Sequence, residues 1–203
     1  ADQGHRCLWL GRSAALFEEV EAPEGLIQVL TGSGSDVGTP LIEHKIPSVV
    51  SFTGSTEVGR KIGEAVMKSS RIKDLELELG GNNAIIITPN ADLEITIIGA
   101  LFGAVGTCGQ RCTSTRRLIV HNSIYDEVKN SLAKAYTQLK IGNPLDEKNH
   151  VGPLIDKQAV EMYLNAIEKA KTEGGKVLVE GGVLDGPGYE SGCYVKPVII
   201  EAE

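Results

Sequence analysis

Two residues of this sequence, Cys112 and Glu78, are candidates for catalysis because of their type and setting. Cys112 follows a run of small and apolar residues and the pair Gly109-Gln110, where backbone amides can approach a thiolate and an oxyanion beside it. Glu78 ends an alternating leucine-rich segment, where a carboxylate has little reason to lie unless it faces a cleft. Partial burial there would raise its pKa towards neutrality, which suits a base that activates water. The pair therefore predicts a thiol nucleophile and a general base.

Each candidate also has a purely structural interpretation. An isolated cysteine is more often an inert buried residue than a nucleophile, and Cys108 is interpreted in that way. Glu78 has the alternative of being a solvated glutamate at a strand end, as Glu76 is expected to be. The surrounding sequence has to decide between these interpretations.

The composition is that of an α/β protein able to bury a core, with 203 residues of which 41% are hydrophobic and 23% charged. Lys and Arg number 20 against 27 acidic residues, and the net charge of −7 argues against nucleic acid or an anionic membrane as partner. The sequence has no apolar stretch long enough to span a bilayer and no signal-peptide pattern, so an intracellular, cytoplasmic protein is expected. The 4 cysteines include no CxxC pair, so we expect reduced thiols and no metal site.

The periodicity of the apolar residues predicts strands that alternate with helices. Strands are expected at residues 26–30, 48–52, 75–79, 84–87, 117–121, 176–179 and 194–200. Helices are expected at residues 38–44, 56–68, 93–106, 123–139 and 156–173, with the helix at 93–106 buried and Ser123 capping the one after it. The strand–helix–strand–helix order of the first part indicates a parallel sheet with crossover helices, and hence an α/β fold.

Several motifs, in the correct order, resemble those of the aldehyde dehydrogenase superfamily. They are FTGSTEVG at 52–59, ELGGNN at 78–83, GTCGQRC at 106–112 and VKP at 195–197. The resemblance covers nearly the whole chain from about Pro23 onward. Within the superfamily, NNA at 82–84, GQRCT at 109–113 and the pair Arg116-Arg117 are most similar to the α-aminoadipic semialdehyde dehydrogenase (antiquitin) branch.

The resemblance implies an aldehyde dehydrogenase-like fold, with residues 1–79 as the C-terminal part of a Rossmann-like NAD(P)-binding domain and residues 80–203 as most of a catalytic domain. It implies oxidation of an aldehyde to a carboxylic acid, with NAD+ or alternatively NADP+ as hydride acceptor. Cys112 would form a thiohemiacetal with the aldehyde, and water activated by Glu78 would hydrolyse the thioester left after hydride transfer. The substrate would be a small aldehyde such as the α-aminoadipic semialdehyde of lysine catabolism, and the whole protein would be a homo-oligomer.

The same resemblance implies cofactor and substrate contacts. Gly54 and Ser55 would contact the pyrophosphate, because a helix begins there and its free N–H groups favour a phosphate, although such a cap is also common as a structural feature. Leu79 and Gly80 would line the nicotinamide pocket. Arg111 would bind a carboxylate at the far end of the substrate, or would be a solvated surface residue.

Two other functions are alternatives: a CoA-acylating or phosphorylating aldehyde dehydrogenase, and a non-catalytic structural or binding relative on the same fold. The acylating branches tend to lack the strand-end glutamate, so Glu78 argues against them, and the presence of both Cys112 and Glu78 argues against a non-catalytic relative. The family's oxyanion asparagine, its ribose-binding lysine and its EIFGPV motif are not found in this chain. We therefore expect an internal fragment that is inactive when expressed alone.

Overall fold

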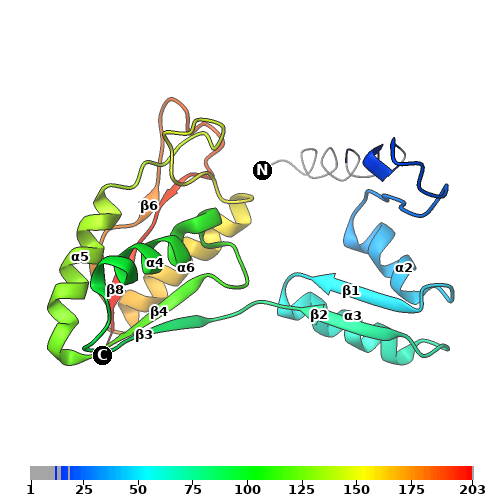
Figure 1. The fold of residues 1–203 in the computed structure, drawn as a ribbon, viewed down its shortest axis with the longest axis horizontal. Coiled ribbons are helices and arrows are strands. Elements are labelled where there is room, and N and C mark those ends of the chain that lie inside the picture. The colour runs from blue at the N-terminus through cyan, green and yellow to red at the C-terminus, as the bar shows by residue number, and fades with distance from the viewer. Residues whose placement is uncertain (1–11, 13–14, 18, 203) are drawn as a thin grey trace. The chain divides into compact units, whose positions relative to one another are not determined.

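The computed structural model describes residues 12, 15–17 and 19–202. The chain divides between Gly80 and Gly81 into two compact units, one residue beyond the boundary expected from the sequence (Figure 1). We call the residues up to Gly80 the first unit and those from Gly81 onward the second unit. Both units contain helices and strands, which confirms the predicted α/β class.

The first unit is built on a parallel pair of strands joined by a helix. Its elements are the π-helix η1 (Gly34–Gly38), α2 (Thr39–Glu43), β1 (Val49–Thr53), α3 (Thr56–Lys68) and β2 (Asp74–Glu78). β1 and β2 pair in parallel, from Val49 opposite Asp74 to Thr53 opposite Glu78. This strand–helix–strand order is the crossover arrangement that the sequence predicts.

Helix α3 forms where predicted because its N-terminal cap and its apolar face are both encoded locally. The Ser55 hydroxyl accepts a hydrogen bond from the N–H of Val58 at 3.2 Å and so caps the first turn. Ile62 is buried on the inner face of the helix. On β2 the side chains alternate, and Leu75 lies on the side of α3, where a Cβ added to Gly63 would be 3.8 Å from Leu75 Cδ2. The leucines of β2 thus pack against α3.

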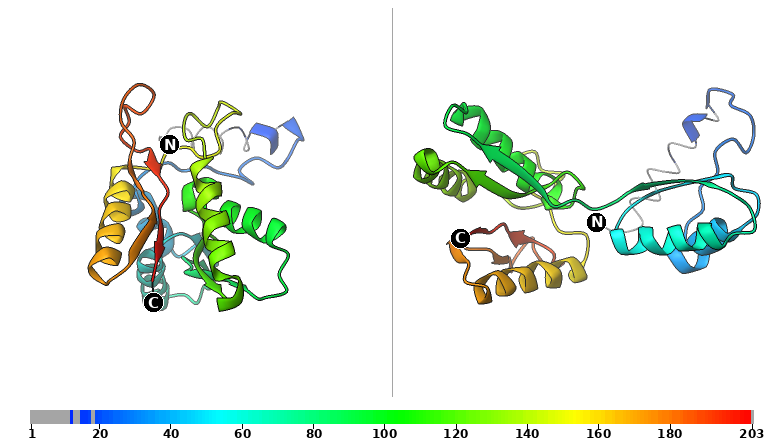
Figure 2. Two further views of the ribbon diagram at one scale, coloured as in Figure 1. Left: turned by 90° about the vertical axis from the view of Figure 1, so that its left-hand side faces the viewer. Right: turned by 90° about the horizontal axis from the view of Figure 1, so that it is seen from below.

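The second unit contains three strand pairs and three longer helices among the residues described. Its elements are β3 (Asn83–Ile87), α4 (Leu93–Val105), the 3-10 helices η2 (Gly106–Gly109) and η3 (Asn122–Ile124), β4 (Thr115–Val120), α5 (Tyr125–Thr137), α6 (Lys157–Thr172), β5 (Lys176–Val179), β6 (Gly182–Val183), β7 (Val195–Lys196) and β8 (Ile199–Glu201). β3 pairs with β4 in parallel, whereas β5 with β8 and β6 with β7 are antiparallel (Figure 2).

The core of the second unit lies between α4, α5 and the β3–β4 pair. Ile87 at the end of β3, Ala100 on α4 and Val128 on α5 are each at most 2% exposed. Aspartates cap the helices that flank this core. Asp92 accepts a hydrogen bond from the N–H of Glu94 at 3.0 Å at the start of α4, and a second aspartate caps α6 in the same way.

Residues 26–30 do not form the predicted strand, since no strand of the described chain pairs with them. An apolar run needs a hydrogen-bonded neighbour to become a strand, and the sequence pattern does not report whether one is present. Ser123 is not the cap of the next helix either. It lies inside η3, and its N–H donates to Nδ1 of His121 at 3.2 Å. The predicted strand at 194–200 is divided into β7 and β8 on either side of Pro197, which has no N–H to donate to a ladder.

The composition of α4 predicted a buried helix, but α4 is not buried on all sides. Ile95, Ile98 and Phe102 are 70%, 64% and 63% exposed, so they form an apolar strip on the outer side of the helix within its unit. Periodicity did not reveal this strip because both sides of α4 are apolar. Among the described residues, no helix is both long and apolar enough to cross a membrane.

Candidate active site

Cys112 lies in a tight turn of four residues, Arg111–Ser114, that is closed by two hydrogen bonds. The N–H of Ser114 donates to the carbonyl of Arg111 at 3.1 Å, and the N–H of Arg111 donates to the Ser114 hydroxyl at 3.1 Å. Ser114 is 1% exposed, whereas Cys112 is exposed and its thiol is free. The turn thus presents an accessible thiol on a backbone that is anchored by a buried serine.

The chain enters this turn through a strained segment. Thr107, Cys108 and Gly109 follow α4 with φ of 52°, 56° and 65°, in the left-handed region that costs a non-glycine residue about 1 kcal/mol or more. Side-chain contacts with the loop at 153–155 hold the segment. The thiol of Cys108 donates to the carbonyl of Pro153 at 3.2 Å, and the amide oxygen of Gln110 accepts from the N–H of Ile155 at 3.0 Å.

Burial raises the pKa of the Cys108 thiol, which keeps it protonated at neutral pH. Its hydrogen bond to a backbone carbonyl gives it a place in the loop packing. Cys108 is half-buried and Cys112 is exposed, so the two thiols of this segment differ in accessibility. Cys193 is also half-buried, and Cys7 lies outside the described residues.

The start of β3 touches the back of the turn that carries Cys112. The side-chain amide of Asn83 donates to the carbonyl of Cys112 at 2.7 Å and to the carbonyl of Ser114 at 3.2 Å. A Cβ added to Gly81 would lie 2.5 Å from the carbonyl oxygen of Cys112, so only glycine fits at this approach. Gly81 and Asn83 belong to the ELGGNN motif, but the sequence pattern does not indicate a physical role for either residue. The pairing of β3 with β4 brings them to this turn.

Arg111 is half-buried and folds back over the end of α4. Its Cζ atom lies 5.0 Å from the centre of the Phe102 ring, and its Nη2 donates to the Phe102 carbonyl at 3.5 Å. Its Nε is buried and has no hydrogen-bond partner among the described residues. Of the two interpretations, that of a fully solvated side chain does not fit this packing, while the substrate contact stays a prediction.

Gly54 and Ser55 lie between β1 and α3 in the first unit. The N–H of Gly54 donates to the carbonyl of Glu78 at 3.0 Å, which joins the ends of the two strands. The hydroxyl of Ser55 serves as the cap of α3, so the structural interpretation of this serine holds. A Cβ added to Gly54 would lie 2.4 Å from the Phe52 ring. The first-turn N–H groups of α3 still present positive potential that would suit a phosphate.

Leu79 and Gly80 follow β2 and stay close to α3. A Cβ added to Gly59 of α3 would lie 2.4 Å from Cδ2 of Leu79, so the leucine side chain packs on this glycine. Gly80 lies beside Thr56, whose Oγ1 would be 3.8 Å from an added Cβ. Both residues are therefore at the same end of α3 as the Ser55 cap.

Glu78 is exposed within its own unit, so this unit by itself does not supply the partial burial expected from the sequence. The alternation on β2 puts its leucines on the α3 side and Asp74, Glu76 and Glu78 on the other side. The carboxylate therefore faces away from the apolar core of the first unit, and any burial has to come from outside this unit.

The predicted site residues fall into two groups. Glu78, Gly54, Ser55, Leu79 and Gly80 belong to the first unit, where the strand and helix ends bring them together. Cys112 and Arg111 belong to the second unit and share one turn. In the part of the chain that the structure describes, there is no group of three or more side chains that would suit a metal ion.

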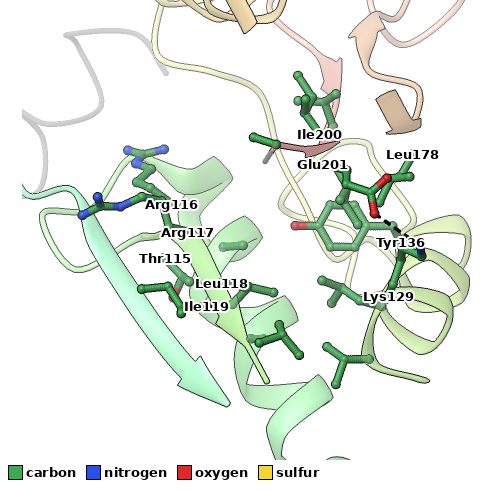
Figure 3. A pocket seen from close by; sticks show the side chains of 18 of the residues that line it. Thr115, Arg116, Arg117, Leu118, Ile119, Lys129, Tyr136, Leu178, Ile200 and Glu201 are labelled. Atoms are coloured by element: carbon green, nitrogen blue, oxygen red, sulfur yellow. Dashed lines mark hydrogen bonds and ion pairs between the residues drawn. The ribbon is translucent and has the colours of Figure 1, made fainter. Parts of the chain in front are cut away.

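A cavity of about 560 Å³ in the second unit is separate from the turn that carries Cys112 (Figure 3). It is lined by residues of β4, α5 and β8, and neither Cys112 nor Arg111 is among them. Tyr136 projects into it, and burial raises the pKa of this tyrosine to about 12. At its edge, the Tyr125 hydroxyl donates to Oε1 of Glu201 at 2.6 Å and Lys129 Nζ lies 3.3 Å from the same oxygen. These two contacts lower the pKa of Glu201 and join β8 to α5.

Comparisons with known proteins agree on one family. The model of the aldehyde dehydrogenase family matches residues 7–202. The α-aminoadipic semialdehyde dehydrogenase of Bos taurus is 46% identical over 97% of this chain and 38% of its own length. The α-ketoglutaric semialdehyde dehydrogenase of Bacillus subtilis is 40% identical over 92% of this chain and 38% of its own length. The chain therefore spans about two fifths of the length of these relatives.

Solved structures give the same result. An aldehyde dehydrogenase from Burkholderia cenocepacia is 36% identical, with a TM-score of 0.89 over 95% of this chain and 39% of its own. The betaine aldehyde dehydrogenase of Staphylococcus aureus, in complex with NAD+, is 34% identical with a TM-score of 0.86 over 93% of this chain and 37% of its own.

Proposed function

The chain belongs to the aldehyde dehydrogenase family, and from this we propose that it is part of an enzyme that oxidises an aldehyde to a carboxylic acid with NAD+. The observation that carries the proposal is the exposed thiol of Cys112 on a turn fixed by the buried Ser114. A nucleophile needs both access to the carbonyl carbon and a fixed approach, and this turn combines them.

The reaction divides into acylation and deacylation. The thiolate of Cys112 bonds to the aldehyde carbon, the carbonyl pair moves onto oxygen, and the carbonyl then re-forms as hydride leaves the carbon. NAD+, when bound, accepts this hydride with both its electrons. In deacylation Glu78 takes a proton from water, the water oxygen bonds to the acyl carbon, and the C–S bond breaks to return the thiolate.

The first unit is proposed to hold the cofactor. The N-terminus of α3 offers N–H groups and a positive dipole end to a pyrophosphate, and Gly54 lets the backbone approach it without a side chain. Leu79 and Gly80 lie at the same end of α3, where a nicotinamide would continue from the pyrophosphate. The carboxylate of Glu78 is exposed on the first unit, where water can reach it.

The proposed substrate is an aldehyde that also carries a carboxylate. The two semialdehyde dehydrogenases compared above act, by their names, on semialdehydes of dicarboxylic acids. Arg111 adjoins Cys112, and its guanidinium is the cation nearest in sequence to receive the distant carboxylate. By the same resemblance we propose α-aminoadipic semialdehyde, and so lysine catabolism, for a cytoplasmic homo-oligomer.

The test of the nucleophile uses Cys112→Ala in the natural protein, with Cys193→Ala as the control. We expect Cys112→Ala to lower turnover by at least about a thousand-fold while NAD+ affinity is retained, because no hydride leaves before the thiohemiacetal forms. Cys193→Ala should keep nearly full turnover. Substantial activity in Cys112→Ala would refute the assignment and favour a non-catalytic role for this cysteine.

The test of the base uses Glu78→Gln, with Glu76→Gln on the same side of β2 as the matched control. Stopped-flow absorbance should show a burst of about one NADH per site for Glu78→Gln, followed by slow turnover, because acylation precedes the step that needs the base. Glu76→Gln should behave as wild type. Equal steady-state rates in all three proteins would remove Glu78 from the mechanism, and a dependence on added CoA would favour the acylating class.

A further inference from the structure

The side-chain amide of Asn83 makes two hydrogen bonds that no other feature of the nucleophile turn duplicates. Nδ2 donates to the carbonyl of Cys112 at 2.7 Å and to that of Ser114 at 3.2 Å, on either side of Thr113. Both acceptors are carbonyl oxygens, so the atom that faces them has to be the NH2 group. The amide therefore bridges the two ends of the segment that carries the thiol.

The other described hydrogen bonds of the turn do not involve the main-chain carbonyl of Cys112, which accepts from Asn83. The bonds between Arg111 and Ser114 close the turn from within and use the carbonyl of Arg111 and the hydroxyl of Ser114. Gly81 approaches the Cys112 carbonyl closely but has no side chain that could donate to it. The Asn83 amide is thus the described donor to the carbonyl of the Cys112–Thr113 peptide, and it adds to the bonds that close the turn from within.

The strand that carries Asn83 is itself fixed beside the turn. β3 pairs with β4, which begins directly after Ser114. Nη2 of Arg117 on β4 donates to the main-chain carbonyl of Asn82 at 2.6 Å. The side chain of Asn83 is short, and its strand is held on one side by the hydrogen bonds to β4. The amide therefore has little freedom and can hold the turn in a defined position.

We propose that Asn83 is a positioning residue for the nucleophile, whose amide holds the main chain of Cys112 in the orientation from which the thiolate attacks. The proposal rests on the proposed function, in which Cys112 is the nucleophile. Asn83 makes no bond to the thiol itself, and its effect passes through the backbone of the turn. Attack geometry is sensitive to displacements of about an ångström, so a small rotation of this peptide is sufficient to slow the reaction.

The adjacent asparagine supplies a matched control. Asn83→Asp keeps the shape of the side chain but turns the donor group into an acceptor that faces two carbonyl oxygens. Asn82→Asp adds the same charge one residue earlier, where only the main-chain carbonyl makes a described hydrogen bond. Asn83→Ser retains one hydroxyl donor and is the conservative variant. The three variants separate loss of the donor from added charge.

Two readouts are measured on the natural protein. The first is the rate of Cys112 alkylation by iodoacetamide as a function of pH, followed by mass spectrometry of the labelled peptide. The second is the division of the effect between kcat and KM for NAD+-dependent oxidation of an aldehyde. We expect Asn83→Asp to lower kcat about tenfold with KM nearly unchanged, because two hydrogen bonds of modest strength are lost. We also expect it to shift the pH dependence of the rate of Cys112 alkylation. Asn82→Asp should change either quantity less than about twofold, and Asn83→Ser should recover part of the loss.

The proposal is overturned if Asn83→Asp and Asn82→Asp have equal effects, since charge alone would then account for them. It is also overturned if the loss in Asn83→Asp matches its loss of folded protein in a thermal melt, because the role would then be only structural. Alkylation needs no turnover, so its profile tests the position of Cys112 even if Cys112→Ala were to disprove the proposed nucleophile.

Discussion

Replacing Gly81 by alanine tests the close packing behind Cys112, the proposed nucleophile, with the smallest possible change. The added Cβ would lie 2.5 Å from the carbonyl oxygen of Cys112, and also 2.9 Å from Nδ2 of Asn83. Ordinary contacts of a Cβ begin at 3.4 Å, so the backbone of the turn and the start of β3 have to separate by up to 0.9 Å. The nearest obstacle is a main-chain atom, which cannot rotate away as a side chain can.

The expected size of the effect follows from this displacement. Overpacking of this kind costs about 1–3 kcal/mol of stability. A misplacement of about an ångström at a reacting group costs on the order of a hundred-fold in rate. We therefore expect Gly81→Ala to lower kcat/KM for aldehyde oxidation by about a hundred-fold, and to lower the melting temperature by only a few degrees.

The assay is steady-state NADH formation in the natural protein, together with thermal unfolding followed by circular dichroism. The control is Gly99→Ala on the exposed side of α4, where an added Cβ meets nothing within 4 Å. This variant should keep wild-type kinetics and gain about 0.5–1 kcal/mol of stability from helix propensity. Wild-type kcat/KM in Gly81→Ala would show that the turn can move without loss, and would refute the argument from close packing.

Three further predictions concern the second unit. The hydroxyl of Tyr125 and a lysine of α5 lower the pKa of Glu201, so this carboxylate stabilises the fold above its ordinary pKa and the contribution is lost as pH falls through the lowered value. The difference in melting temperature between wild type and Glu201→Gln should thus be present at pH 7 and vanish in acid; a constant difference would contradict this. Leu132→Ala, at a residue that is 6% exposed, should cost about 2–5 kcal/mol in urea unfolding, and a loss below 1 kcal/mol would mean that the site collapses without a cavity. Iodoacetamide should label exposed Cys112 before half-buried Cys108, and peptide mapping that shows the reverse order would contradict the assignment of the reactive thiol.

Local features of the chain were predictable from the sequence. The helix expected at 56–68 is α3 at the same residues, because the Ser55 cap and the spacing of its apolar side chains are contained within the segment. The strands expected at 84–87 and 176–179 are β3 and β5 within one residue. The family, too, was predictable, since its motifs are short runs of sequence, and the comparisons confirm it.

Features that depend on residues far apart in the chain were decided by the tertiary structure. Within the first unit, the packing of α3 takes the leucine side of β2 and leaves the Glu78 carboxylate exposed, so its partial burial in a cleft stays a prediction. The apolar run at 26–30 has no strand partner in the part of the chain that the structure describes. The contacts of Asn83 with the turn that carries Cys112 span 29 and 31 positions in the sequence. Periodicity and capping act within one or two helical turns, whereas these contacts exist only after parallel pairing has brought β3 beside β4.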